Sequence, residues 1–391
     1  MTNLRGICML TADLDSPTGG VQGQSVRLLK ELSSRGIAVS VCTRNYHHMA
    51  RSEVREGIHI HRSPAWSRSL RALNSASYLA NAVTWLARHR SEYDVIHCQQ
   101  MFGPATAALL AKPLVRKPVI VRVSSTGELG EVADLRRMPL ASARIRQLRD
   151  VDHWVALTRL MASEIETLGV SADRISIVPN GATVPNDSAV QPDTRAKYRE
   201  RLGLRYGRIG IYSGRLSSEK NLDTLLQAWV GIRADFPGAH LLLVGAGGAF
   251  RNVEASLREL QAKLGLEQCV HFVGHVTNVS EYLLASDVFV LPTSTEGMSN
   301  ALLEAMAAGN AIVTTDIEAN REVVSAGETA LLVPPRDAEA LRHAIARVFA
   351  TDDLASRLGS RARQLAERRH SVRAMADAYL EVYERAIQVR N

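Results

Sequence analysis

Two short segments carry residues suited to binding a diphosphate and a sugar. The first, Gly214-Arg215-Leu-Ser-Ser-Glu-Lys220-Asn, directly follows the apolar run 209–213 and opens the helical pattern 222–236. A helix N-terminus offers unpaired amides and a partial positive charge. Arg215 adds a bidentate fork and Lys220 a compact second charge. A surface Arg and Lys at a helix start is the plainer alternative, but placement directly after a strand and a glycine favours diphosphate binding.

The second segment is Glu296-Gly-Met-Ser-Asn-Ala-Leu-Leu-Glu304, which follows the apolar run 288–291. A helix is expected to begin near Asn300, which places Glu296 in the loop and Glu304 one turn inside the helix, tilted toward its N-terminus. A carboxylate there can accept two hydrogen bonds from adjacent ribose hydroxyls. Amides of the Met298, Ser299 and Asn300 segment can hold a phosphate or sugar oxygen. Either Glu alone is better explained as a loop or capping residue.

These segments need a scaffold that places them after strands, and the rest of the chain predicts one. Short apolar runs alternate with helix-period segments from end to end, which indicates βαβ units and parallel sheets. Expected strands lie at 4–10, 37–42, 95–98, 119–123, 154–157, 175–178, 209–213, 241–244, 270–273, 288–291, 311–314 and 330–333. Ligands of such open sheets bind beyond the carboxyl ends of strands. The fold class is therefore α/β, with two Rossmann-like doubly wound domains facing a cleft.

The domain boundaries follow from length and composition. The 391 residues suit two domains of about 150–200 residues each. We predict a first Rossmann-like domain at 1–181, a Pro- and Asp-rich linker at 182–207, a second Rossmann-like domain at 208–365 that carries both motifs, and a final helix at 366–391.

Charge is distributed unevenly between the two halves. Residues 1–180 hold 23 Lys and Arg against 15 Asp and Glu, whereas the remainder holds 24 against 25. This asymmetry suggests an anionic partner for the first half, with a solvated Arg-rich surface as an equal alternative. We hypothesise that the basic stretches Arg62–Arg90 and Arg136–Arg149 contact anionic lipid at the membrane surface. Aromatic residues make up 5% of the chain, which disfavours a stacking platform for nucleic acid.

The cysteines and apolar runs indicate a compartment. Cys8, Cys42, Cys98 and Cys269 form no CxxC motif, and the first three lie in strand-like runs typical of small core residues. This fits a reducing environment. The apolar run Ile7–Leu10 is too short for a signal peptide, and no run approaches the roughly 18 residues of a spanning helix. We expect a cytoplasmic protein, with a peripheral membrane contact.

Taken together, the two motifs resemble retaining glycosyltransferases of the GT-B fold, in the large family 4 of sugar-nucleotide-dependent enzymes (glycosyl transferases group 1). The resemblance spans nearly the whole chain, and the Glu-x7-Glu pair with the upstream Arg-x4-Lys is its specific part. Further matching segments are Gly19-Gly20, Tyr93-Asp-Val-Ile-His97, Val178-Pro-Asn180-Gly181, Leu242-Leu-Val-Gly245 and Phe272-Val-Gly274-His275-Val276.

The resemblance implies that 1–181 is an acceptor-binding domain, that 208–365 is a nucleotide-sugar-binding domain, and that the final helix at 366–391 returns to the first domain. It also implies roles for individual residues. Arg215 and Lys220 would neutralise the departing diphosphate, so that catalysis is mostly electrostatic. Glu296 would contact the donor sugar and Glu304 would hold the ribose. The remaining implied donor-binding residues are Gly19, Gly20, Gly214, Val276, whose backbone would recognise the base, Gly297, Met298, Ser299 and Asn300. The reaction implied is transfer of a hexose to a glycan or lipid-linked acceptor with retained configuration, in polysaccharide or cell-envelope glycan synthesis.

The acceptor side departs from the family pattern. Members often carry a His in the loop after the strand at 119–123, and here that loop reads Ser-Ser125-Thr126-Gly-Glu128. Ser125, Thr126 or Glu128 would then touch the donor sugar or the acceptor, and a plain loop remains an equal alternative for Glu128. His97, at the end of its strand, is a further acceptor candidate, although a packed or solvated His is the more frequent case.

Family members need neither metal nor cofactor, and we expect none here beyond the nucleotide-sugar co-substrate. The spacings Asp13-Leu-Asp15 and Asp150-Val-Asp152 are interpreted as loop or surface acids. Two other functions stay open, namely a sugar-nucleotide epimerase of similar fold and a non-catalytic sugar-nucleotide-binding subunit. A nicotinamide dehydrogenase is disfavoured because the Gly245-Ala-Gly247-Gly248 run lacks its third fingerprint glycine.

Overall fold

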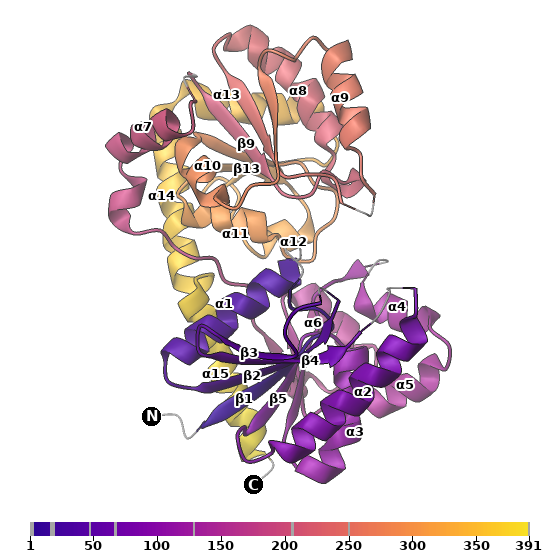
Figure 1. The fold of residues 1–391 in the computed structure, drawn as a ribbon. Helices are drawn as coiled ribbons and strands as arrows, with labels where there is room; N and C mark the ends of the chain where they lie inside the picture. Colours follow the sequence, from indigo (N-terminus) through magenta and orange to yellow (C-terminus); the bar gives the residue numbers. More distant parts are fainter. Residues whose placement is uncertain are drawn as a thin grey trace. The chain divides into compact units, whose positions relative to one another are not determined.

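The structure is a computed structural model that describes residues 4–15, 20–46, 48–65, 69–127, 130–204, 207–248 and 251–389. The chain divides into two compact units (Figure 1). The first comprises residues 1–181 and 372–391, and the second comprises residues 182–371. Each unit has its own sheet and its own apolar core, so the prediction of two doubly wound α/β domains is confirmed.

The first unit contains an eight-stranded sheet with the order β3-β4-β2-β1-β5-β6-β7-β8. The strands are β1 (Gly6–Leu10), β2 (Ala38–Asn45), β3 (Ser52–Arg55), β4 (Ile58–Pro64), β5 (Val95–Cys98), β6 (Val119–Arg122), β7 (His153–Ala156) and β8 (Ile175–Ile177). All neighbours pair in parallel except the edge strand β3, which is antiparallel to β4. The six strands from β4 to β7 have the doubly wound order 3-2-1-4-5-6, so the chain reverses its direction of winding between β1 and β5.

Helices cover both faces of this sheet. They are α1 (Gly20–Ser34), α2 (Arg71–Arg88), α3 (Gly103–Val115), α4 (Glu131–Arg137), α5 (Ala141–Leu148), α6 (Arg159–Glu166) and α15 (Val372–Gln388), with a 3-10 turn at Ala172–Arg174. One face packs Ile7, Met9 and neighbouring apolar side chains against α1 and α15. Helix α15, drawn in yellow, thus belongs to the first unit although it ends the chain (Figure 1).

The second unit repeats the doubly wound order with six parallel strands, β11-β10-β9-β12-β13-β14. They are β9 (Ile209–Ser213), β10 (His240–Val244), β11 (Val270–Gly274), β12 (Val288–Leu291), β13 (Ala311–Thr315) and β14 (Leu331–Val333). The helices are α7 (Pro192–Arg201), α8 (Leu222–Asp235), α9 (Glu254–Lys263), α10 (Val279–Ala285), α11 (Asn300–Ala307), α12 (Glu318–Arg321), α13 (Ala338–Ala350) and α14 (Asp352–Arg369), with 3-10 turns at Asp187–Val190 and Ser218–Lys220. Here the winding reverses between β9 and β12.

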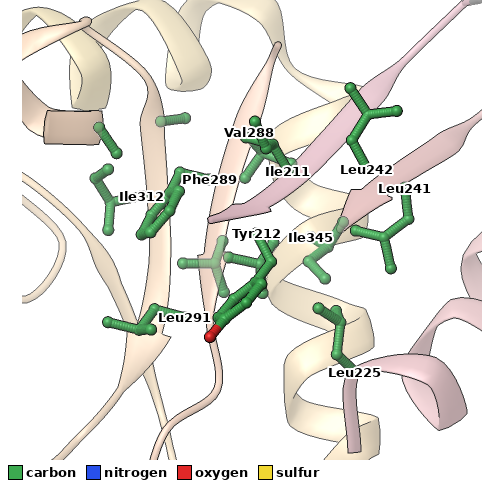
Figure 2. Packing of buried hydrophobic residues seen from close by; sticks show 14 of the residues in the cluster. Ile211, Tyr212, Leu225, Leu241, Leu242, Val288, Phe289, Leu291, Ile312 and Ile345 are labelled. Atoms are coloured by element: carbon green, nitrogen blue, oxygen red, sulfur yellow. The ribbon is translucent and has the colours of Figure 1, made fainter. Parts of the chain in front are cut away.

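The core of the second unit is formed by strands that are buried on both faces. Residues of β9 and β12 are all buried, which explains why these segments are continuous apolar runs in the sequence. Figure 2 shows Ile211, Val288 and Phe289 of the central strands packed with Leu225 of α8 and Ile345 of α13. This rigid centre fixes the positions of the loops that leave β9 and β12.

The segment expected to be a linker is integrated into the second unit. Arg199 of α7 donates to Asp287 at 2.7 Å and to the Ala285 carbonyl at 2.8 Å, which ties the helix to the loop before β12. Arg363 of α14 donates to the carbonyls of Pro185 (2.6 Å) and Ala307 (2.8 Å). The second unit therefore begins at residue 182, and it extends to residue 371 because α14 continues to Arg369, past the boundary expected at 366.

No helix in the described ranges combines the length and the apolar character needed to cross a membrane.

Candidate active site

The loop after β9 begins with a glycine that permits a close backbone approach. Gly214 has a φ of +143°, and its amide donates to the Val244 carbonyl at 2.9 Å. Gly245, at the end of β10, has a φ of +134°, and a Cβ placed there would lie 1.9 Å from the Gly214 carbonyl oxygen. Both positions therefore require glycine. The pair lets the loops after β9 and β10 pass in contact at the carboxyl edge of the sheet.

Arg215 combines a fixed backbone with an exposed side chain. The Tyr212 hydroxyl donates to the Arg215 carbonyl at 2.6 Å, and burial together with the charges of Glu296 and Glu219 raises the Tyr212 pKa well above its ordinary value. This phenol therefore stays neutral and keeps its donor. The Arg215 side chain is 56% exposed and lies 3.5 Å from Glu219 Oε1. Its guanidinium is available at the surface of the loop for a ligand.

Lys220 and Glu296 meet although they are 76 residues apart in the sequence. Lys220 lies in the 3-10 turn before α8, Glu296 lies in the loop after β12, and the Lys220 Nζ donates to Glu296 Oε1. Their side chains are 12% and 11% exposed. The structure thus brings the two predicted motifs together through an ion pair.

The backbone also joins these two loops. The Glu219 carbonyl accepts hydrogen bonds from the Ser294 amide (3.0 Å) and the Thr293 hydroxyl (3.1 Å). Asn221, with a φ of +48°, donates its side-chain amide to the Pro292 carbonyl at 3.2 Å. Both loops leave the strands between which the winding reverses, which is where open α/β sheets bind ligands.

Glu219 is a residue of this site that sequence reasoning did not assign. Its Oε1 accepts from the Ser217 hydroxyl at 2.6 Å. Burial alone would raise the Glu219 pKa, but the hydrogen bonds from Ser217 and from its own amide, with the charges of Lys220 and Arg215, lower it overall. It therefore stays ionised, with Arg215 at 3.5 Å as its ion-pair partner. The sequence feature that indicates a role for Glu219 is its position between Arg215 and Lys220 in the first motif.

Helix α11 begins where the sequence predicted. Ser299 is its N-cap and accepts a hydrogen bond from the Leu302 amide at 3.3 Å, while Asn300 is the first helical residue. Glu304 is half-buried one turn further on, and Gly297 and Met298 lie in the loop before the cap. The helix N-terminus and the Lys220–Glu296 pair thus belong to one loop cluster.

The base-recognition candidate follows a different strand. Val276 comes two residues after β11 and packs partly buried against the core of the second unit. Its strand is the edge strand beside β10, so Val276 lies at the same carboxyl edge as Gly214 and Gly245.

In the first unit, Gly20 is the first residue of α1, whereas Gly19 falls outside the described residues. Asp15, the last described residue before that gap, belongs to a buried ion pair that the sequence did not predict. Arg62 is fully buried, and it donates to Asp15 Oδ2 (2.8 Å), to Asp15 Oδ1 (3.1 Å) and to Glu53 (2.9 Å). Arg62 is therefore no lipid-contacting residue, and Asp15, with a side chain that is 5% exposed, is no surface acid. The period-2 pattern Ile58, Ile60, Arg62 was the signal, because it puts Arg62 on the buried face of β4.

The other paired acids have structural partners as well. Asp152 accepts from the Val119 amide and from Lys112, both at 2.7 Å. Among the described residues no group of three or more His, Cys, Asp or Glu side chains is arranged to hold a metal ion.

His97 is a packed histidine rather than an acceptor contact. It is fully buried, its Nδ1 shares a hydrogen bond of 2.7 Å with the Tyr383 hydroxyl of α15, and its ring lies 5.0 Å from that of Tyr379. Burial, and then the charge of Arg122, lower the His97 pKa to about 3. His97 therefore adopts the packed alternative that the sequence analysis gave as the more frequent case, because Tyr379 and Tyr383 of α15 cover its ring.

The loop after β6 is held by two carboxyl groups. Ser124 donates its amide (2.9 Å) and hydroxyl (2.6 Å) to Glu131, which also accepts the Met101 amide at 3.0 Å. Thr126 donates its hydroxyl to Glu164 at 2.5 Å. Ser125 lies between them, half-buried, and Glu128 is outside the described residues. Hydrogen bonds to Glu131 and Glu164 thus fix the residues on both sides of Ser125.

A buried arginine, which the sequence did not predict, lies at the end of β6 just before this loop. Arg122, at the end of β6, is 2% exposed and donates to Gln99 (2.8 Å) and Asn180 (2.6 Å). Nearby, Glu131 is buried and its pKa is raised by burial, against the opposing effect of its hydrogen bonds and of Arg122. No local sequence feature marks Arg122 as buried, because its partners come from distant segments.

Comparison with known proteins assigns the chain to a family. Residues 207–351 match the family model of the glycosyl transferases group 1, and residues 19–181 match the glycosyl transferase 4-like domain. Between them the two models cover most of both units. The chain therefore belongs to the group 1 glycosyltransferases and has the GT-B fold.

Named relatives and solved structures agree with this assignment. The chain is 26% identical to the putative glycosyltransferase EpsD of Bacillus subtilis over 74% of this chain and 76% of that protein. It is 30% identical to the lipopolysaccharide core biosynthesis glycosyltransferase LpsE of Rhizobium meliloti over 61% and 66% of the two chains. A crystal structure of Anabaena Alr3699/HepE in complex with UDP and glucose has a TM-score of 0.77 at 19% identity, over 97% of this chain and 99% of that chain. At that identity the likeness concerns the fold.

Proposed function

We propose that this protein transfers a hexose from a nucleoside-diphosphate sugar to a glycan or glycolipid acceptor with retention of configuration and without a metal ion. The observation that carries the proposal is the joining of two loops at the winding reversal of the second unit. There Lys220 and Glu296 pair, Arg215 presents an exposed guanidinium, and Glu304 lies one turn into α11. Two cations and a helix N-terminus suit a diphosphate, and a carboxylate suits a ribose diol.

In this proposal the protein acts through charge. Arg215 and Lys220 stabilise the negative charge that develops on the departing diphosphate, and such preorganised electrostatic stabilisation is commonly the largest catalytic contribution. When the donor binds, Lys220 pairs with the diphosphate in place of Glu296. Glu296 then accepts a hydrogen bond from a hydroxyl of the donor sugar. The departing phosphate helps to deprotonate the acceptor hydroxyl on the same face, so that no protein nucleophile is required.

A role in polysaccharide or cell-envelope glycan synthesis is part of the proposal. Its support is the naming of relatives such as the lipopolysaccharide core glycosyltransferase of Rhizobium meliloti and the phosphatidyl-myo-inositol mannosyltransferase of Mycobacterium leprae. We also propose a cytoplasmic location, because the proposed co-substrate is a sugar nucleotide.

The decisive experiment is a thermal-shift screen of the full chain against UDP, GDP, ADP and their sugars. A ligand that binds only the folded state raises the melting temperature, by an amount set by its concentration over its Kd. We expect one base series to raise it, and Arg215→Gln to reduce that shift. No shift with any nucleotide would contradict the proposal. Epimerised sugar nucleotide formed without an acceptor would identify an epimerase, and binding without any turnover would favour a binding subunit.

Two finer points have their own measurements once a donor is found. Proton NMR of the fresh product reports the anomeric configuration, and an inverted product would contradict retention. Transfer measured in excess EDTA is expected to equal transfer in its absence, and a loss restored by Mg²⁺ would contradict metal independence.

We also propose that the first unit contacts anionic membrane. Its support is the basic excess of residues 1–180 together with leucines exposed on one group of helices: Leu110 (50%) and Leu114 (57%) on α3, and Leu140 (79%) between α4 and α5. Arg137 and Arg144, on α4 and α5, are exposed beside Leu140 in the sequence. Flotation with anionic vesicles is expected to carry the protein, and Leu140→Asp is expected to weaken it. Equal flotation with neutral vesicles, or none, would contradict the proposal.

A further inference from the structure

Arg44 is a cation at the carboxyl edge of the first sheet that none of the roles above uses. It is the penultimate residue of β2, and its guanidinium carbon lies 4.8 Å from the centroid of the Tyr78 ring on α2. Its only hydrogen bond within the described residues is a long one of 3.5 Å to the Tyr46 hydroxyl. No carboxylate in the described part of the chain forms an ion pair with it. Arg44 thus has no countercharge there.

The N-terminus of α3 lies directly against this guanidinium. Helix α3 has 13 residues, its N-cap residue Phe102 makes no side-chain capping bond, and a Cβ on its first residue Gly103 would lie 3.1 Å from Arg44 Nη2. A helix N-terminus carries a partial positive charge, which favours anions and disfavours cations. Two positive features are therefore adjacent, and a negative group between them would stabilise both.

Buried polar atoms beside Arg44 also lack partners. Ser63, which pairs with Arg44 across the strands, and Tyr78 are both 0% exposed. The Ser63 Oγ, the Tyr78 Oη and the Arg44 Nε have no hydrogen-bond partner among the described residues. Leaving a buried polar group without a hydrogen bond is unfavourable, so such a group in a native structure calls for a partner. Arg44 Nε can only donate and both hydroxyls can donate, so an anionic acceptor would suit all three.

The Glu131 carboxyl group reaches the residues just before α3, but its oxygens already accept hydrogen bonds from other groups. It accepts the Met101 amide, two residues before α3, and both donors of Ser124. It therefore does not neutralise Arg44. In the first sheet the winding reverses between β1 and β5, and open sheets bind ligands at such a point. Arg44 lies close to it, because β2 neighbours β1 and α3 follows β5.

We propose that Arg44, Ser63 and the N-terminus of α3 form a binding site for a compact anionic group, phosphate or carboxylate, carried by the acceptor. The guanidinium fork fits two oxygens of such a group, and the partial positive charge at the start of α3 and the Ser63 hydroxyl suit the others, although Pro104 contributes no amide there. That the group belongs to the acceptor rests on the proposed function. The site itself rests on the geometry around Arg44.

The test is a calorimetric titration of the full chain with inorganic phosphate. It is done in an Arg215→Gln, Lys220→Met background, which removes the cations of the second unit as a competing phosphate site. We expect saturable binding that Arg44→Gln weakens at least about tenfold, in line with the loss of a charged hydrogen bond. Arg88→Gln, an exposed arginine at the far end of the helix that carries Tyr78, is the matched control and is expected to leave binding unchanged. Absence of saturable binding, or equal binding by Arg44→Gln, overturns the proposal.

A second variant keeps the charge and tests the geometry. Gly103→Ala suits a helix, but its Cβ would displace the Arg44 guanidinium by a few tenths of an ångström. We expect phosphate binding to weaken with the melting temperature maintained, and unchanged binding would overturn the placement at α3.

The source of the anion is distinguished by parallel titrations with inorganic phosphate, glucuronate and neutral glucose. Tighter binding of phosphate assigns a phosphorylated acceptor, tighter binding of glucuronate assigns an acidic sugar, and glucose binding equal to both overturns the proposal. The nucleotide thermal shift serves as the independent readout, because Arg44→Gln is expected to retain it. If no nucleotide shifts the native chain while phosphate still binds through Arg44, the proposed function fails and the site stands.

Discussion

The two units share one strand order but use charged side chains differently at the point where the winding reverses. In the second unit, Lys220 and Glu296 pair at an edge where both remain partly exposed, and Arg215 is 56% exposed. In the first unit the charged groups are buried beneath the loops, as with Arg62 bound to Asp15 and with Arg122. The second unit presents these charges to solvent, whereas the first unit uses Arg62 and Arg122 to hold segments of the chain in place.

This difference separates stability from activity. A buried ion pair that loses one partner leaves the other charge desolvated and uncompensated, and folding becomes less favourable. A partly exposed cation that loses its charge leaves the fold largely intact but no longer stabilises an anionic ligand. Substitutions of arginine and lysine in the two units should therefore have opposite profiles.

The largest effect is expected for Arg62→Met in the first unit. Removing the guanidinium leaves Asp15, with a 5% exposed side chain, without its main countercharge. We expect the free energy of unfolding of the first unit to fall by about 3–5 kcal/mol. Scanning calorimetry of the full chain measures this as an earlier first transition. Arg55→Gln is the control, because its side chain is 40% exposed and its contact to Asp15 is worth about 0–1 kcal/mol. A similar small loss in both variants would show that burial does not set the size of the effect.

The next effect concerns activity, in the second unit. Lys220→Met removes the charge proposed to face the leaving diphosphate, and we expect sugar transfer to fall by about 10²–10³-fold, as for the loss of one preorganised donor. Lys197→Met on the exposed side of α7 is the matched control and is expected to retain activity. The measurement is kcat/KM for donor turnover. A loss below about threefold would remove Lys220 from the catalytic machinery and weaken the contrast between the units.

The sequence predicted where the two loops of the second unit lie because its motifs are local. Lys220 and Glu296 each lie in a contiguous motif that follows a strand and opens a helix, so the position of each loop could be inferred without knowing the other. Their ion pair joins residues 76 apart, and only the fold brings them together.

The first unit was less predictable because its important contacts are not local. Arg122 finds Asn180 58 residues away, and Arg62 finds Asp15 47 residues away. For His97 the sequence left an acceptor contact and a packed ring as alternatives, and the packed ring depends on Tyr383 of α15, which lies 286 residues later in the chain. The residue type of a cation or a histidine in a strand does not indicate burial. Only the alternation of apolar residues around it can, as with Ile58 and Ile60 before Arg62.

A smaller effect should appear as a pH dependence of the first unit. Burial lowers the His97 pKa to about 3, so the folded chain keeps this ring neutral while the unfolded chain protonates it below about pH 6.5. The unfolded state then binds more protons, and stability falls with decreasing pH by about 1.4 kcal/mol per pH unit from this group. His97→Asn is expected to remove that contribution between pH 6 and pH 4.

The measurement is urea unfolding of the first unit at half-unit pH steps. His59→Asn, which changes an exposed histidine of β4, is the control and is expected to keep the native slope. Identical slopes for His97→Asn and the native chain would mean that His97 titrates normally, and that α15 does not seal the carboxyl end of β5.

The smallest effect tests whether the second unit's charges depend on the backbone contacts between its loops. Thr293→Val keeps the shape of a fully buried side chain but removes its hydrogen bond to the Glu219 carbonyl at 3.1 Å. That carbonyl still accepts the Ser294 amide at 3.0 Å, so we expect a loss of about 1 kcal/mol in stability and a several-fold weaker nucleotide affinity. Calorimetry and nucleotide titration measure the two. Thr84→Val, which removes a hydroxyl contact within the exposed part of α2, should leave nucleotide affinity unchanged. Unchanged affinity in Thr293→Val as well would mean that the Lys220–Glu296 pair positions the loops without this backbone link.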